Sequence, residues 1–142
     1  MANNFNQSVI DEFRANAGQV GGNFQGATLL LLKTAGKKSG EPRTTPLMYM
    51  ADGERMIVIG SAAGADNHPA WFHNLMAKGR ALVEVGTEEL PVRAELLTGD
   101  EHQRLWEKLI AARPGFAEYQ QRTSRKIPLV ALSRDGDQER PD

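Results

Sequence analysis

Residues 28–51 have the sequence TLLLLKTAGKKSGEPRTTPLMYMA and contain the pattern that decides the fold. Two apolar runs, Thr28 to Lys33 and Thr44 to Ala51, are each typical of a strand, and the leucine density of the first predicts burial on both faces. The turn between them is cationic, with four basic residues from Lys33 to Arg43. Pro46 predicts a sheet edge or a bulge in the second run, because proline cannot donate a strand hydrogen bond.

The remaining pattern extends this hairpin into a larger antiparallel sheet. Asp52-Gly53 is a typical hairpin turn, and a second hairpin is expected around residues 86–89. Thr98 and Glu101 form a capping-box pattern at the start of a helix, which Pro114-Gly115 ends. Further strands are expected at 55–60, 81–85, 90–97 and 127–133, and other helices at 8–19, 71–78 and 116–123.

This order predicts a mainly β (α+β) fold with inserted helices, namely a closed or half-closed antiparallel barrel of six or seven strands. A doubly wound Rossmann sheet is disfavoured. We expect an N-terminal helix and glycine-rich linker at 1–26, the barrel at 27–133 and a polar, disordered tail at 134–142.

Composition narrows the function. The 142 residues include 17 basic and 18 acidic ones and no cysteine, which excludes disulfides and thiolate chemistry and disfavours nucleic-acid binding. The longest apolar run, residues 27–32, is too short to span a bilayer. We therefore expect a cytoplasmic protein, with peripheral contact at the inner face of the membrane through the N-terminal helix left open.

The cationic turn is suited to an anion. Gly36 and Gly40 permit close backbone approach, and the donors Lys37, Lys38, Ser39 and Arg43 suit phosphate or several carboxylates. The alternative is a solvated hairpin whose lysines protect a sheet edge. It is not a Walker A loop, because Lys37 replaces the glycine before Lys38 and the turn joins two strands.

Residues 60–75 form the second informative segment. Small residues from Gly60 to Ala65 would let a flat ligand lie on backbone, and Trp71 and Asn74 share one helix face. In the alternative reading, Trp71 belongs to the core and Asn74 caps or bridges loops. Tyr49, Tyr119 and Ser61 are candidate proton donors or structural hydroxyls.

Other chemistries lack support in the pattern. His68 and His73 lie five residues apart, and His102 is expected on the surface of a separate helix. This is not the spacing of a metal site, so no metal is expected. Neither Ser39 nor Ser61 lies on a nucleophile elbow. Hydrolase chemistry is therefore not indicated.

Taken together, the motifs resemble the deazaflavin-dependent nitroreductase family of actinobacteria. The similarity is dense from Thr28 to Val85 and continues thinly toward the C-terminus. The matching motifs are Gly36-Lys37-Lys38-Ser39-Gly40, Pro42-Arg43, Pro46-Leu47, Ser61 to Gly64, Pro69-x-Trp71, Asn74-Leu75, Arg113-Pro114-Gly115-Phe116-x-x-Tyr119 and Arg125-x-Ile127-Pro128.

The resemblance implies a flavin-reductase-like split β-barrel that binds coenzyme F420, a deazaflavin with a phosphate and an oligoglutamate tail. Its reduced form would donate the hydride. By motif position, the implied cofactor-binding residues are Lys37, Lys38, Ser39, Arg43, Thr45, Pro46, Leu47, Met48, Ser61, Ala62, Ala63, Trp71 and Asn74.

For the acceptor site, the resemblance implies Met48, Phe116, Tyr119 and Arg122. Three of these, Met48, Phe116 and Arg122, depart from aromatic or hydroxyl-bearing residues of the nitroimidazole-activating member, which predicts a changed acceptor preference.

We therefore expect an F420H2-dependent oxidoreductase that passes a hydride from C5 of the deazaflavin to a quinone, enone or nitro-type acceptor, with Ser61 or Tyr119 donating to the acceptor oxygen. Two alternatives remain open: an FMN-binding split-barrel reductase, or a carrier of F420 or a haem-like group that lacks turnover. The oligomeric state is also open.

Overall fold

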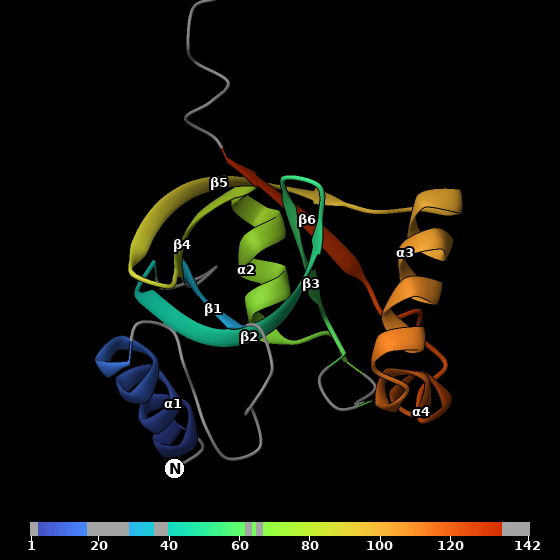
Figure 1. Cartoon of the computed structure of the whole chain (residues 1–142), viewed down its shortest axis with the longest axis horizontal. Coiled ribbons are helices and arrows are strands. Elements are labelled where there is room, and N and C mark those ends of the chain that lie inside the picture. Colours follow the sequence, from blue (N-terminus) through green and yellow to red (C-terminus); the bar gives the residue numbers. More distant parts are fainter. Residues whose placement is uncertain (1–2, 17–28, 36–39, 62–63, 65–66, 135–142) are drawn as a thin grey trace, which may run out of the picture.

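The structure is a computed structural model that describes residues 3–16, 29–35, 40–61, 64 and 67–134. Its centre is a closed antiparallel barrel with the strand order β1-β2-β3-β6-β5-β4 (Figure 1). The strands are β1 (Leu29–Ala35), β2 (Pro42–Asp52), β3 (Arg55–Ile59), β4 (Arg80–Val85), β5 (Glu88–Leu96) and β6 (Leu129–Arg134). The helices are α1 (Asn3–Ala15), α2 (Ala70–Lys78), α3 (Gly99–Ala112) and α4 (Gly115–Gln121).

The leucine run of β1 is buried on both faces, as its composition predicts. Leu30 and Leu32 point into the barrel core, whereas Leu29 and Leu31 pack under α1 beside Phe13. Alternate residues of a strand point to opposite faces, so a strand buried on both sides needs apolar residues at every position. The barrel interior covers one face of β1, and α1 covers the other.

Helices cover different parts of the barrel surface. In Figure 1, α1 lies beside β1 and β2, whereas α3 and α4 lie at the opposite side, next to β6. Leu105 and Leu109 of α3 pack with the outward residues Ile57 and Ile59 of β3. Helix α2 contributes Trp71, among others, to the core inside the barrel.

Strand β2 is only partly paired, and this shapes the functional surface. It pairs with β1 from Pro42 to Met48, but with β3 only from Tyr49 to Asp52. On the side away from β1, residues 42–48 therefore have no strand partner among the residues that the structure describes. Such an edge offers backbone N–H and C=O groups to a ligand.

Pro46 lies within β2, opposite Leu31 of β1. The expected edge position is confirmed in this sense, because one side of β2 lacks a strand partner there. The strand continues through Pro46 without interruption.

Several boundaries differ from expectation. Helix α1 begins at Asn3 rather than at residue 8, and β6 begins at Leu129 and includes Arg134, which was expected in the polar tail. The rest of the expected tail, residues 135–142, lies outside the described residues, as does most of the expected glycine-rich linker. The second hairpin is tighter than expected, because Val85 already pairs with Glu88. Leu96 is 43% exposed, whereas Leu97, the residue after β5, is buried.

The expected capping box at the start of α3 is wrong. Thr98 makes no side-chain cap hydrogen bond. Glu101 instead accepts from Arg55 Nη2 at 2.7 Å, and the same guanidinium donates to Asp52 at 2.6 Å. The Arg55 hydrogen bond is the main reason that the pKa of Asp52 is lowered. The Glu101 side chain therefore forms a tertiary ion pair with Arg55 instead of the expected local cap.

Candidate active site

A cavity of about 340 Å³ lies at the start of β2, between α1 and α2. It brings together four residues that the sequence predicts for the cofactor, namely Arg43, Thr45, Trp71 and Asn74. They come from two elements about 30 residues apart in the chain. Glu41, Pro42, Thr44, Ala70 and three residues that the sequence reasoning missed, Gln7, Ile10 and Thr34, complete its lining. We call this cavity the β2 pocket.

The β2 pocket has features that suit an anion. Arg43 supplies a guanidinium, and Ala70 and Trp71 place the first turn of the nine-residue helix α2 at its wall. The N-terminal end of a helix carries partial positive charge and free N–H groups. Glu41 is the acidic residue of the lining and acts against this charge.

Thr34 provides a separate indication of a ligand. Its side-chain oxygen is buried and has no hydrogen-bond partner among the residues that the structure describes. A buried hydroxyl without a partner costs free energy, so an unpaired one beside a cavity points to a missing ligand or water. The strand alternation of Leu30, Leu32 and Thr34 could have identified this residue, because it places Thr34 on the inner face at the end of β1.

Helix α1 forms one wall of the β2 pocket and is fixed to the barrel. Phe13 is fully buried, and Arg14 donates to Glu84 of β4 at 2.6 Å. Lys33 also pairs with Glu84, at 3.1 Å. These hydrogen bonds, with that from Arg14 the largest influence, hold the pKa of Glu84 below its usual value.

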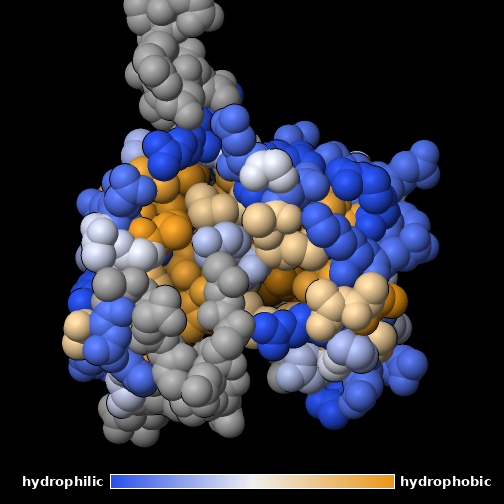
Figure 2. Space-filling model, in the orientation of Figure 1, coloured by the Kyte–Doolittle hydropathy of each residue, from blue (hydrophilic) through white to orange (hydrophobic). Residues whose placement is uncertain are grey.

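A second, smaller cavity of about 190 Å³ opens on the outer side of β2. Met48 and Met50 lie on one wall, and Leu109, Ala112 and Arg113 of the α3 end lie on the other. Figure 2 shows apolar residues at the floor of a hollow beside the α3 and α4 side of the molecule. We call this cavity the Met48 pocket; its α3 residues were missed at the sequence level.

Ser61 follows β3, the strand that pairs with the second half of β2. Its carbonyl accepts from Gly64 N at 2.8 Å and from Arg125 Nη2 at 2.9 Å. The side chain is half-buried. The backbone of Ser61 is thus held from two directions.

Tyr119 and Phe116 lie together on α4. Their rings form an edge-to-face pair with centroids 5.7 Å apart, and both pack against the cluster that contains Leu109 and Ile59. The guanidinium of Arg122 lies 5.5 Å from the centre of the Tyr119 ring. Because Leu109 and Ile59 also line the Met48 pocket, the predicted acceptor residues border the same region, although Met48 alone among them lines the cavity.

Some predicted residues cannot be placed or are placed differently. Lys37, Lys38, Ser39, Ala62 and Ala63 lie outside the described residues. The Leu47 side chain packs against the barrel core, so only its backbone can face the unpaired edge. His102 was expected on a helix surface, but it is 4% exposed and its Nε2 bonds the carbonyl of Ile127 at 2.9 Å.

The small residues near Ser61 have a structural explanation at both described glycines. A Cβ on Gly60 would lie 2.8 Å from Pro128, and one on Gly64 would lie 2.8 Å from the carbonyl oxygen of Tyr119. Protein packing, rather than a ligand, therefore requires glycine at these two positions. At Gly60 and Gly64, a cofactor ring lying on the backbone is therefore not needed to explain why the side chains are small.

The fold is a split β-barrel, and the β2 pocket brings a guanidinium and the first turn of α2 together at the start of β2. Residues 6–134 match the family described as F420H(2)-dependent quinone reductase. An F420H(2)-dependent quinone reductase of Mycobacterium tuberculosis is 36% identical over 126 residues, which cover 86% of this chain and 85% of that protein.

Solved structures agree. One described as an F420-H2 dependent reductase has a TM-score of 0.67 at 34% identity, covering 75% of this chain and 94% of that chain. Another, described as a domain-swapped dimer, has a TM-score of 0.68 at 34% identity, covering 75% and 80% of the two chains. This chain belongs to the F420H(2)-dependent quinone reductase family. The predicted split-barrel fold, deazaflavin-dependent family and oxidoreductase class are confirmed.

Proposed function

We propose that this protein uses reduced coenzyme F420 to reduce a quinone or a related enone. The observation that carries the proposal is the β2 pocket, in which Arg43, the α2 N-terminus and the buried hydroxyl of Thr34 meet at the start of β2; within the described part of the chain, that hydroxyl has no hydrogen-bond partner. Family membership supports the choice of F420 as the anionic ligand.

The residues fit the parts of this cofactor. Arg43 and Thr34 would hold the phosphate and the glutamate tail, together with Lys37, Lys38 and Ser39, which the sequence places next to them. From Arg43 to Met48 the strand extends about 16 Å. This free edge suits the elongated link between an anionic tail and a planar ring.

Bound F420H2 would supply a hydride from C5 of its ring. The protein's part is then to bind, orient and exclude water. Trp71 and Asn74 would hold the cofactor against β2, and Pro46, Met48, Ser61, Ala62 and Ala63 would border the ring. Orientation of two reactants accounts for much of the barrier reduction in such reactions.

Negative charge develops on the acceptor oxygen as the hydride arrives. Ser61 and Tyr119 are the proposed donors to that oxygen. Met48, Phe116 and Arg122 would shape the acceptor site. The Met48 pocket combines methionine, isoleucine and leucine side chains with polar groups, Arg113 among them, a mixture that suits the ring and oxygens of a quinone.

Direct titration tests the proposal. Purified protein should bind F420 more tightly than FMN, with the affinity falling as salt rises. Arg43→Ala should weaken F420 binding about tenfold to a hundredfold, since a charge-assisted hydrogen bond contributes about 1.5 to 3 kcal/mol. Lys78→Ala, at the opposite end of α2, is the matched control and should leave affinity unchanged.

Turnover separates the alternatives. Oxidation of F420H2 by a soluble quinone should be catalysed by the wild-type protein. Binding without turnover would favour a carrier, whereas preference for FMN would favour a flavin reductase. Equal F420 affinity in Arg43→Ala and the wild-type protein would remove the proposed anion site.

The helices of the structure also bear on contact with a membrane. No helix in the described part of the chain is both long and apolar enough to cross a membrane. Peripheral membrane contact through α1 is not part of the proposal, because Val9, Ile10 and Phe13 are buried against the barrel.

A further inference from the structure

Arg125 connects two points of the chain that border the proposed site. Its Nη1 donates to the carbonyl of Gly60 at 3.1 Å, and its Nη2 donates to the carbonyl of Ser61 at 2.9 Å. Nη1 also lies 2.9 Å from Nδ1 of His68. One planar guanidinium therefore holds both the end of β3 and the residue before the Pro69 cap of α2.

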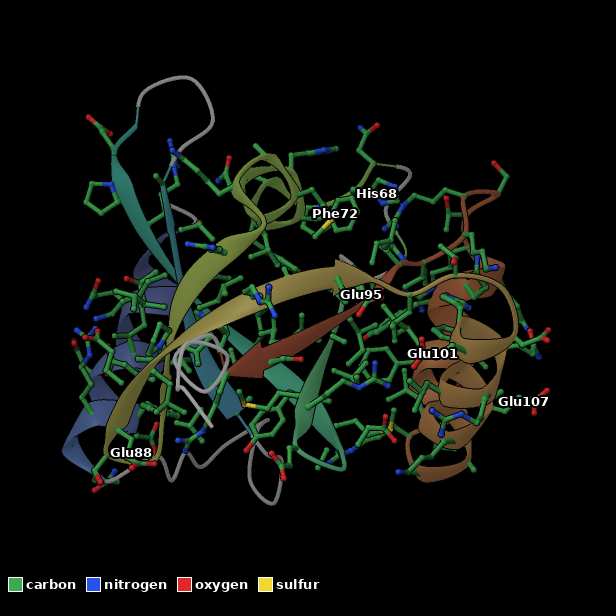
Figure 3. All side chains as sticks on the ribbon, turned by 90° about the horizontal axis from the view of Figure 1, so that it is seen from above. His68, Phe72, Glu88, Glu95, Glu101 and Glu107 are labelled. Atoms are coloured by element: carbon green, nitrogen blue, oxygen red, sulfur yellow. The ribbon has the colours of Figure 1, made fainter. Side chains whose placement is uncertain are left out.

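His68 is suited to accept this hydrogen bond. Arginine can only donate, so Nδ1 of His68 must be the acceptor and the ring must be neutral. Burial, with smaller influences from Arg125 and His73, lowers the pKa of His68. Its ring also packs on Phe72 of α2, with centroids 4.7 Å apart, and Figure 3 shows the two rings side by side.

The backbone of Arg125 is itself anchored. Gln120 of α4 donates from Nε2 to the carbonyl of Arg125 at 2.6 Å and accepts from Ile127 N at 3.0 Å. The carbonyl of Ile127 bonds His102 of α3. The guanidinium is therefore presented from a segment fixed to both α3 and α4.

Gly64 connects Ser61 to α4 through close backbone contacts. Gly64 approaches the Tyr119 carbonyl so closely that a Cβ would not fit. The hydrogen bond from Gly64 N to Ser61 O joins this contact to the atom that Arg125 also binds. The position of Ser61 is thus set relative to the helix that carries Tyr119.

We propose that Arg125 is a positioning residue that holds Ser61 and the start of α2 in a fixed arrangement relative to Tyr119, and that this arrangement sets the rate of hydride transfer. The inference rests on the proposed function. Arg125 acts through these groups, without contact with the reacting atoms. Binding of the anionic F420 tail at Arg43 should depend on Arg125 much less.

Arg125→Met and Arg125→Lys test this role. Lysine keeps the charge, but it donates from a single point and cannot reproduce the planar fork that reaches Gly60, Ser61 and His68. Lys126→Met is the matched control, because it removes one exposed cation from the same segment. Melting temperature, F420 dissociation constant and single-turnover oxidation of bound F420H2 by a soluble quinone are measured for each variant.

The expected result is a split between binding and rate. Arg125→Met should lower the single-turnover rate about tenfold to a hundredfold, as misplacement of reacting groups does, while F420 affinity changes much less. Arg125→Lys should recover part of the rate, and Lys126→Met should match the wild-type protein.

Two negative results have different meanings. The positioning role is wrong if the wild-type protein turns over and Arg125→Lys has the full single-turnover rate. It is also wrong if Arg125→Met folds and has the full rate. In both cases the proposed function stands. If Arg125→Met does not fold, Arg125→Lys decides alone. If the wild-type protein does not bind F420, the proposed function fails and this inference fails with it.

Discussion

Replacement of Thr34 by valine should have opposite effects on stability and on cofactor binding. The two side chains have nearly the same shape, and valine is equally suited to a strand. The wild-type hydroxyl is buried at the β2 pocket, with no partner in the described ranges of the chain. Its removal therefore relieves a desolvation cost without creating a cavity.

The magnitude follows from the cost of such a group. An unsatisfied buried hydroxyl costs about 1 to 3 kcal/mol, so Thr34→Val should raise the free energy of unfolding by about 1 kcal/mol or more. For a chain of this length, about 1 kcal/mol corresponds to about 3 °C in melting temperature. If the hydroxyl bonds an anionic group of F420, its loss should weaken binding about tenfold or more.

Calorimetry of the apo protein and titration with F420 measure the two effects. Thr98→Val is the matched control, because the Thr98 hydroxyl is exposed and makes no cap hydrogen bond; it should leave binding unchanged. Lower stability in Thr34→Val would show that the hydroxyl has a partner in the apo protein. Unchanged F420 affinity would refute its role in the site.

Three further predictions concern packing, pH and acceptor choice. Gly64→Ala should destabilise the protein by about 2 to 4 kcal/mol in urea unfolding, because φ is +84° and the new Cβ would meet the Tyr119 carbonyl. The control Gly53→Ala, where φ is +61° but the space is open, should lower the free energy of unfolding by about 1 kcal/mol, and an equal decrease in both variants would contradict the packing argument. Burial, followed by Arg125 and His73, lowers the pKa of His68 in the folded protein, so on acidification His68 is protonated in the unfolded state first, and the free energy of unfolding should fall as the pH drops below about 6.5. His68→Gln should reduce this fall, and the same pH dependence of stability in the variant and the wild-type protein would contradict the role of His68. Quinones or enones should be reduced about tenfold to a thousandfold faster than bicyclic nitroimidazoles, as kcat/KM with F420H2, because Met48, Phe116 and Arg122 offer no hydroxyl to a nitro oxygen; a preference for the nitroimidazole would show that these residues do not set specificity.

Local patterns in the sequence predicted most of the elements. The leucines of β1 required burial on both faces, and Asp52-Gly53 required a turn. Each of these depends on a few adjacent residues, whose periodicity and backbone preferences are readable without partners. The cationic turn and the motifs around Trp71 likewise indicated the family.

The tertiary structure decided how these elements meet. Barrel closure places β6 between β3 and β5, and in the part of the chain that the structure describes the first half of β2 pairs with β1 alone. It also turned Glu101 from a helix cap into a partner of Arg55, and His102 from a surface residue into a buried one. Ion pairs and close packing between distant segments outweighed the local preference in both cases.

By itself, the sequence predicted the strands to within a few residues and indicated the family, because these follow from local composition and order. Only the tertiary structure brought Thr34 to the wall of the β2 pocket and Arg125 to the carbonyl of Ser61, 64 residues away. Such contacts depend on how the barrel closes and on which side chains fill the space between segments. The spacing of residues along the chain does not encode that geometry.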